Sequence, residues 1–152
     1  MVSQPPAKIA IEPDDYHAEF VGQTEAGTQF FLTTPFVPAT PGQPRREFIA
    51  LYLFDPAGQL VEARIDPWDH GEGDGDIEAR LRRIESWLAD LGDYVHTRIE
   101  VQPFRLERFG VEFGLIPRPP EEGDVDGKWW VILEPGNYMA FHEPFDSGDY
   151  DT

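Results

Sequence analysis

The sequence predicts an α+β fold, in which one amphipathic helix packs on one face of a mostly antiparallel sheet of about eight strands. Three observations support this prediction. Only one segment has apolar residues at a helical spacing, short apolar runs bounded by turn residues occur on both sides of it, and 14 glycines and 15 prolines interrupt the 152-residue chain. The order of strands, one helix and further strands lacks the repeated β–α alternation of a doubly wound fold.

The first residues differ from the rest of the chain. Residues 1–15 contain Pro5, Pro6 and Pro13 together with acidic residues, so we expect an extended arm without a regular element. Residues 16–152 are expected to form a single domain with an acidic C-terminal tail, because no internal boundary or repeat is visible. We expect Phe145 and Tyr150 to order part of that tail.

Strands are predicted before the helix. Apolar runs at 16–22 and 28–33 flank a glycine-containing loop, a pattern typical of a β-hairpin. The proline-rich segment 35–44 predicts a long loop, since proline cannot donate a ladder hydrogen bond. The continuous apolar run 47–54 predicts a central strand covered on both faces, and the alternating segment 60–66 predicts its hairpin partner.

The helix is expected over residues 76–91. Its large apolar side chains follow steps of four and three residues, which places them in one stripe on a helical face. The stripe consists of Ile77, Leu81, Ile84, Leu88 and Leu91, with Trp87 beside it. Asp76 is the expected N-cap, and Gly92 is expected to end the helix in the left-handed conformation.

Further strands and one long acidic loop are predicted after the helix. Apolar runs indicate strands at 95–101, 104–106, 111–115, 128–134 and 138–142. Residues 108–110, between the second and third of these strands, predict a tight hairpin. In the first of these, the alternation predicts that Val95, Ile99 and Val101 face the core. The polar segment 117–127 predicts the loop.

Charge and composition exclude several classes of function. Twelve Lys and Arg residues against 29 Asp and Glu residues give a net charge of −17, which disfavours direct binding to nucleic acid. The absence of cysteine excludes a thiol nucleophile and cysteine-ligated metals. No apolar run approaches the roughly 20 residues of a membrane span, and the N-terminus lacks a signal-peptide pattern. We expect a cytoplasmic, bacterial-type protein that needs no cofactor and does not contact membranes.

A carboxylate-rich segment precedes the helix. Asp69, Glu72 and Asp74 are candidate ligands for calcium or magnesium, but Ile77 and Arg83 stand where a calcium-binding loop needs glycine and glutamate. Acidic residues also complement the dipole at a helix N-terminus. This second interpretation needs no metal, and the sequence favours it.

Enzymatic motifs are absent, but one enzymatic alternative remains. No nucleophile elbow, phosphate-binding loop or metal-binding histidine spacing occurs. The alternative is a small-molecule site or active site in a cleft beneath the loops 35–44 and 117–127, with His142 or His96 beside a carboxylate as the base.

Large aromatic residues near charged loops favour a protein-binding function. The candidate contact residues are Trp68, Trp129, Phe145 and Tyr150, with the acidic residues Glu121, Glu122, Asp124 and Asp126. The leading hypothesis is a non-enzymatic binding or regulatory protein, comparable to an inhibitor or immunity protein, that contacts a basic protein. A variant of this hypothesis is a nucleic-acid mimic, whose carboxylates replace phosphates on a basic protein.

Two C-terminal segments resemble a known family. Residues 101–115 (VQPFRLERFGVEFGL) and 134–152 (EPGNYMAFHEPFDSGDYDT) resemble bacterial sequences of the formate hydrogenlyase regulatory protein family. The resemblance covers about residues 93–152 and implies a regulatory role, without site residues to transfer. The net charge of −17 and the lack of a basic recognition helix disagree with a DNA-binding repressor. Regulation of this kind would therefore act through another protein.

Overall fold

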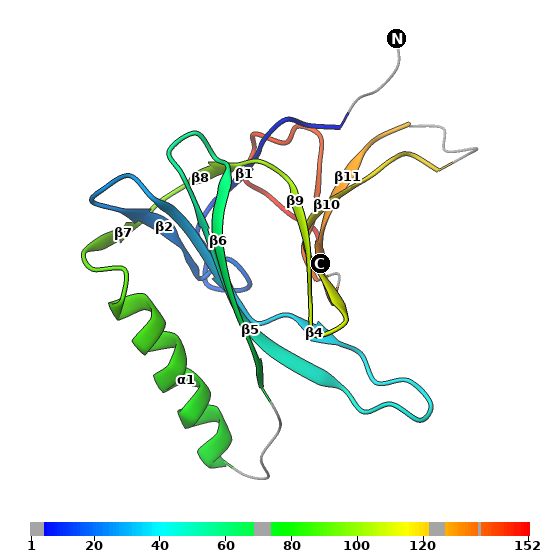
Figure 1. Cartoon of the computed structure of the whole chain (residues 1–152). Coiled ribbons are helices and arrows are strands. Elements are labelled where there is room, and N and C mark those ends of the chain that lie inside the picture. The colour runs from blue at the N-terminus through cyan, green and yellow to red at the C-terminus, as the bar shows by residue number, and fades with distance from the viewer. Residues whose placement is uncertain (1–4, 69–73, 122–126, 137) are drawn as a thin grey trace.

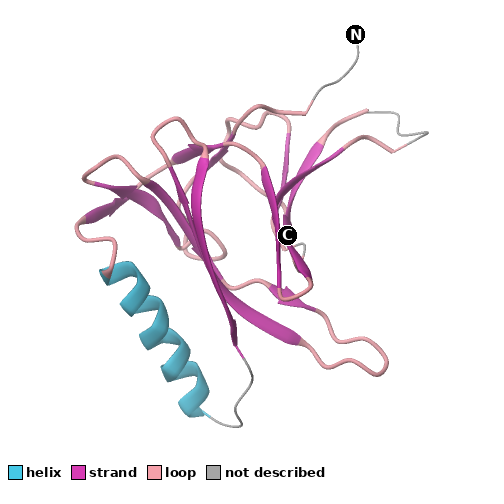
Figure 2. Cartoon of the chain, in the orientation of Figure 1, coloured by secondary structure: helices cyan, strands magenta, loops and turns pink. Residues whose placement is uncertain are grey.

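The computed structural model describes residues 5–68, 74–121, 127–136 and 138–152. Helix α1 covers one face of a six-stranded sheet, and a four-stranded sheet lies across the opposite face, next to a two-stranded sheet (Figures 1 and 2). The predicted α+β class with one helix on a mostly antiparallel sheet is confirmed. The described residues form 12 strands in three sheets, rather than about eight strands.

The six-stranded sheet is antiparallel throughout. It consists of β2 (Phe20–Thr24), β3 (Gln29–Thr33), β4 (Phe36–Val37), β5 (Arg46–Phe54), β6 (Leu60–Trp68) and β7 (Tyr94–His96). Strand β5 pairs with β6 along one edge, and with β3 and then β4 along the other. Phe48 and Tyr52 of β5 face the second sheet while Ile49 and Leu51 face α1, so the predicted central strand is confirmed. The predicted loop 35–44 contains β4, whose register continues that of β3.

The four-stranded sheet has the order β12-β11-β10-β9. Its strands are β9 (Phe104–Arg108), β10 (Val111–Arg118), β11 (Trp130–Glu134) and β12 (Ala140–His142). Phe109 and Gly110 join β9 to β10 with φ values of 56° and 71°, as a two-residue hairpin turn requires. The predicted hairpin is therefore confirmed, although β10 continues to Arg118 and the acidic loop starts later than expected.

The two-stranded sheet departs from the sequence-based expectation in two ways. No element was expected in residues 1–15, but β1 (Ile9–Ile11) is a buried strand that pairs with β8 (Ile99–Val101). The single strand expected at 95–101 is divided into β7 and β8, which belong to different sheets. Val95 is 62% exposed instead of facing the core, because β7 lies at the edge of the large sheet.

Helix α1 spans Asp74–Ala89, and Gly92 follows it with a φ of +76°, as expected. Ile84, Trp87 and Leu88 are buried against a cluster on the six-stranded sheet formed by Phe30, Leu32, Ile49 and Leu51. Leu81, expected in this stripe, is instead 50% exposed. Because α1 begins at Asp74, Asp76 lies within its first turn and is not the N-cap that the sequence predicts. The side chains of Asp76 and of Ile77, the first residue of the expected stripe, lie outside the described residues.

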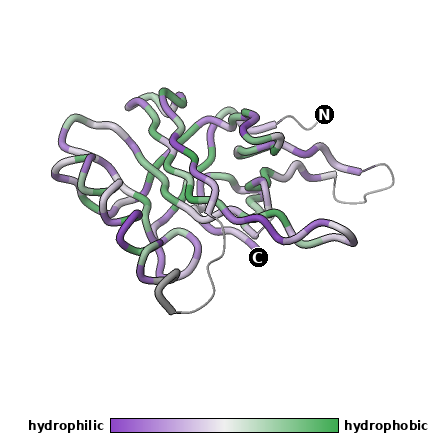
Figure 3. Tube along the Cα trace, turned by 60° about the horizontal axis from the view of Figure 1, so that its bottom comes forward, coloured by the Kyte–Doolittle hydropathy of each residue, from purple (hydrophilic) through white to green (hydrophobic). Residues whose placement is uncertain are grey.

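The C-terminal tail closes the core between the two large sheets. Phe145 and Tyr150 pack against that core, which confirms their expected ordering role. The NH of Ala10 in β1 donates to the carbonyl of Phe145 at 2.8 Å, and Ala140 and Asp151 exchange two backbone hydrogen bonds. Figure 3 shows the most hydrophobic stretches in the interior and hydrophilic stretches in the outer loops.

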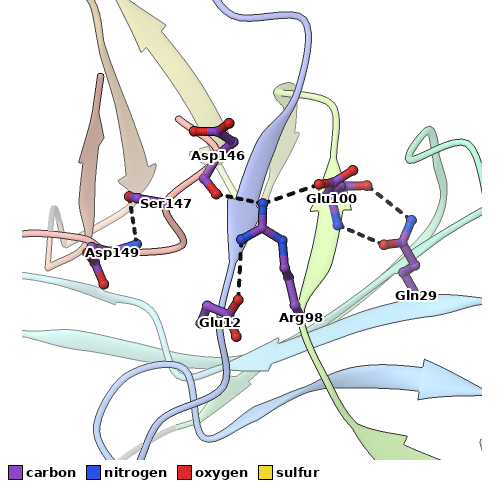
Figure 4. A network of polar contacts seen from close by, with 7 residues as sticks. All are labelled: Glu12, Gln29, Arg98, Glu100, Asp146, Ser147 and Asp149. Atoms are coloured by element: carbon purple, nitrogen blue, oxygen red, sulfur yellow. Dashed lines mark hydrogen bonds and ion pairs between the residues drawn. The ribbon is translucent and has the colours of Figure 1, made fainter. Parts of the chain in front are cut away.

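Arg98 joins the N-terminal strand to the tail (Figure 4). Its guanidinium donates to Glu12 Oε1 at 3.3 Å, to Glu100 Oε1 at 3.2 Å and to the carbonyl of Asp146 at 2.6 Å. The Gln29 amide continues the network, since it accepts from the NH of Glu100 at 2.8 Å and donates to its carbonyl at 3.1 Å. Segments that are distant in sequence are thereby held together beside β8.

Candidate functional site

The aromatic residues expected to form a partner-binding patch belong to different parts of the molecule. Trp68 packs with the cluster beneath α1, whereas Phe145 and Tyr150 pack on the core between the sheets. Trp129 is half-buried just before β11. The structure therefore does not gather these four side chains into one aromatic surface.

The acidic candidates are only partly described. Glu121 is exposed. Glu122, Asp124 and Asp126 of the acidic loop, and Asp69 and Glu72 of the possible cation site, lie outside the described residues, as does the side chain of Asp74. Within the part of the chain that the structure describes, no group of three or more histidine and acidic side chains is arranged to hold a metal ion.

The two histidines expected in a catalytic cleft lie at separate places. His96 is exposed on β7, with its ring against Tyr94. His142 has a carboxylate neighbour, Asp151, at 3.5 Å from Nε2, and its ring contacts Trp130. Neither histidine borders the groove described next.

A groove lies between helix α1, the segment before β2, and strands β3 to β5. It consists of two cavities of about 200 and 210 Å³ that share His17, Thr34 and Arg80. The first cavity is also lined by Tyr16, Glu19, Phe20, Leu32, Thr33, Leu81 and Ile84. The second is also lined by Phe36, Arg45, Glu47 and Tyr138. We call these two cavities the His17 groove.

The backbone around His17 is held by one carboxylate. Asp14 Oδ1 accepts hydrogen bonds from the NH groups of Tyr16 and Ala18, both at 2.9 Å. The Tyr150 hydroxyl donates to Asp14 Oδ2 and accepts the NH of His17 at 3.1 Å. A turn anchored by the C-terminal tail therefore positions His17 at the groove.

These contacts shift two pKa values. Partial burial of Asp14 opposes its charge, but the hydrogen bonds from Tyr150, Tyr16 and Ala18 outweigh burial and lower its pKa below 3.8. Burial and the bond to Asp14 raise the pKa of Tyr150 to about 12. Asp14 is therefore a structural anion whose oxygens are already occupied by donors.

The imidazole of His17 has unused hydrogen-bonding capacity. Its ring lies between those of Tyr16 and Tyr138, with centroid distances of 3.8 and 4.8 Å. Neither ring nitrogen forms a hydrogen bond with a described residue. Burial lowers the pKa of His17 below 6.5, against the opposing effect of Asp14, so the neutral ring offers one donor and one acceptor at pH 7.

Two arginines that line the groove share one glutamate. Arg45 Nη2 lies 3.3 Å from Glu47 Oε1, and Arg80 Nη1 lies 3.8 Å from Glu47 Oε2, which is too long for a hydrogen bond. The Arg45 guanidinium also stacks on Phe36, 4.1 Å from the ring centroid. No described residue accepts a hydrogen bond from the guanidinium of Arg45 or Arg80 or from the Thr34 hydroxyl.

Tyr138 lines the groove but does not act as an acid. Its hydroxyl is hydrogen-bonded to that of Thr33, and its ring stacks on Phe36 at a centroid distance of 5.7 Å. Burial raises the pKa of Tyr138 far above 10 despite the bond to Thr33. The phenol therefore remains neutral and supplies an aromatic surface.

No pattern in the sequence indicates this groove. Its polar groups come from a turn before β2, the link between β3 and β4, strand β5 with the residue before it, and helix α1, so no sequence spacing connects them. The only available signal was His17, one of four histidines without a motif.

Comparison of the chain with protein-family models, curated proteins and solved structures finds no match. These comparisons give no evidence for or against the resemblance of residues 93–152 to the formate hydrogenlyase regulatory protein family, which stays a prediction. Among the described residues, no helix has the length and apolar character needed to cross a membrane.

Proposed function

We propose that this protein is a non-enzymatic binding protein that holds a small molecule in the His17 groove. One observation carries the proposal: His17, Thr34 and Arg80, whose polar side-chain groups form no hydrogen bond with a described residue, converge on the two cavities they share. Small-molecule sites typically combine apolar walls with a few convergent polar groups. Each cavity is smaller than the roughly 300–1,000 Å³ of a typical ligand site, which favours a small ligand.

The arrangement favours binding over catalysis. A histidine base is normally oriented by a partner on its second nitrogen and lies within hydrogen-bond reach of the group that it activates. No described residue forms a hydrogen bond with the His17 ring, and the oxygens of Asp14 bind other donors. The Thr33 hydroxyl is bonded to Tyr138. The groove thus offers recognition groups without a base–nucleophile pair.

A fragment screen by two-dimensional NMR tests the proposal. Neutral, anionic and cationic fragments are titrated into the protein, and we expect at least one class to perturb the amides of residues 16–20, 33, 34, 36 and 80–84 together. Thr34→Phe should fill the groove and abolish these perturbations. Thr40→Phe, which places the same ring in an exposed loop, is the matched control and should retain them. Scattered perturbations, or equal responses from both variants, would contradict the proposal.

A second candidate function is the regulatory contact with a basic protein that the net charge of −17 favours. Electrostatic attraction between oppositely charged proteins speeds association and weakens as salt is added. Capture of the tagged protein from its native lysate at low and moderate salt tests this function. A basic protein retained in near-stoichiometric amount at low salt and released at moderate salt is expected, and its absence at both salt concentrations would contradict it.

A further inference from the structure

We infer that the ligand of the His17 groove is a small organic monocarboxylate with a flat apolar body, bound through its carboxylate by Arg80, His17 and Thr34. The inference rests on the proposed function and adds the chemical class of the ligand. It follows from the donors at the junction of the cavities, from the aromatic walls, and from the charge around the groove.

Donors dominate the junction of the two cavities. A guanidinium carries five NH donors and no acceptor, and Arg80 uses none of them in a hydrogen bond to a described residue. The Thr34 hydroxyl can donate, and so can one nitrogen of neutral His17. A ligand group that satisfies them must be rich in acceptors, and a planar carboxylate matches the fork of a guanidinium.

Apolar and aromatic side chains line both cavities beside these donors. Tyr16 and Leu81, which are 63% and 50% exposed, line the first cavity. In the second cavity, Phe36 and Tyr138, whose rings stack on each other, supply the aromatic lining. A ring-bearing ligand would remove part of the apolar surface of Tyr16 and Leu81 from water, which favours binding.

The charges around the groove limit the ligand to one negative charge. Arg45 and Arg80 repel a cationic ligand, and Glu47 lies between them. Glu19 also lines the first cavity, and the whole chain carries a net charge of −17. A polyanion such as a phosphate dianion meets more repulsion from this field than a monocarboxylate does.

The test is a matched ligand series measured by NMR titration: phenylacetate, phenylacetamide, phenethylamine and inorganic phosphate. Phenylacetate should bind about tenfold more tightly than phenylacetamide, since a charge-assisted bond to arginine is stronger than a neutral one. Phenethylamine and phosphate should bind more weakly still. The perturbed amides should be those of the groove.

Two arginines of the same helix supply the variant and its control. Arg80→Gln should remove the preference for phenylacetate over phenylacetamide. Arg82→Gln removes the same charge from an exposed residue that has no ion pair with a described residue, and should leave the preference within about twofold. Spectra of both variants report whether the fold is retained.

The outcomes separate the inference from the proposed function. If phenylacetamide binds in the groove as tightly as phenylacetate, or if Arg80→Gln and Arg82→Gln behave alike, the carboxylate inference fails while the binding function stands. Tighter binding of phosphate or phenethylamine would also overturn it. If none of the four compounds and no fragment of the wider screen perturbs the groove, both fail.

Discussion

At the scale of single residues, the buried face and the exposed face of helix α1 can be told apart by experiment. Leu88 lies on the face of α1 that packs on the sheet and is 6% exposed, whereas Leu81 of the same helix is 50% exposed. Leu88→Ala should lower the free energy of unfolding by about 2–5 kcal/mol, because it removes buried methyl groups and leaves a cavity. Leu81→Ala should change it by less than about 0.5 kcal/mol. Urea denaturation measures both values, and equal losses would mean that the helix packs through a different face.

Asp14 gives a pH-dependent prediction, since its pKa in the folded protein is lowered below 3.8. A carboxyl group of this kind stabilises the fold fully above pH 3.8, and the stabilisation is lost as the pH falls from 3.8 through the lower folded value. Asp14→Asn keeps an acceptor for the turn but loses the charge. The variant should be less stable than the wild type at neutral pH, and the difference should shrink below pH 3.8.

Unfolding free energies of both proteins across this pH range measure the effect. Asp15→Asn removes the same charge from the neighbouring exposed residue and controls for net charge. A constant difference between wild type and Asp14→Asn at all pH values would show that the charge of Asp14 contributes nothing.

The candidate site shows why single residues were harder to predict than strands. The spacing of apolar residues predicts β5 and α1, because each pattern lies within one continuous segment. The groove is lined by His17, Arg80 and Tyr138, which are far apart in sequence and share no motif. The sequence predicts Trp68 in a surface patch, but aromatic side chains occur both in cores and in interfaces. Only its packing in the cluster beneath α1 shows which of the two roles it has.

At the scale of elements, the C-terminal tail should stabilise the core. Residues 145–152 contribute Phe145 and Tyr150 to it and bond to β1 and β12. Deleting this segment should lower the free energy of unfolding by about 3 kcal/mol, because two partly buried aromatic side chains and the backbone hydrogen bonds to β1 and β12 are lost together. Asp149→Ala, an exposed change in the same tail, should have little effect. Thermal and urea unfolding test both, and an unchanged midpoint after deletion would contradict the role of the tail.

The predicted boundaries of the elements were wrong where tertiary contacts decide the structure. β1 has only three residues next to prolines, and its strand conformation depends on the pairing with β8. The alternation over 95–101 was recognised correctly as extended chain, but it could not reveal that the chain passes from one sheet to another at Thr97 and Arg98. Hairpins were predicted well because turn and strands are contiguous, as for β5–β6 and β9–β10.

At the scale of the whole molecule, the excess of acidic residues sets how the fold responds to salt. With 29 acidic and 12 basic residues, one-to-one pairing would leave 17 acidic groups without a basic partner, and their mutual repulsion opposes the compact state. Salt also weakens ion pairs such as Arg64–Asp90 and Arg83–Asp66. Exposed pairs of this kind contribute only about 0–1 kcal/mol each. The loss of repulsion should therefore exceed the loss of ion pairing.

The resulting prediction is a rise in thermal stability with ionic strength. Between about 10 mM and 200 mM NaCl the screening length falls from roughly 30 Å to less than 10 Å, so repulsion between distant carboxylates is removed. The midpoint of thermal unfolding should increase over this range. Tetramethylammonium chloride at the same ionic strength should give the same increase if screening is the cause, while a sodium-specific increase would indicate bound cations instead. A decrease would mean that ion pairs such as those of Arg98 outweigh the repulsion that the net charge creates.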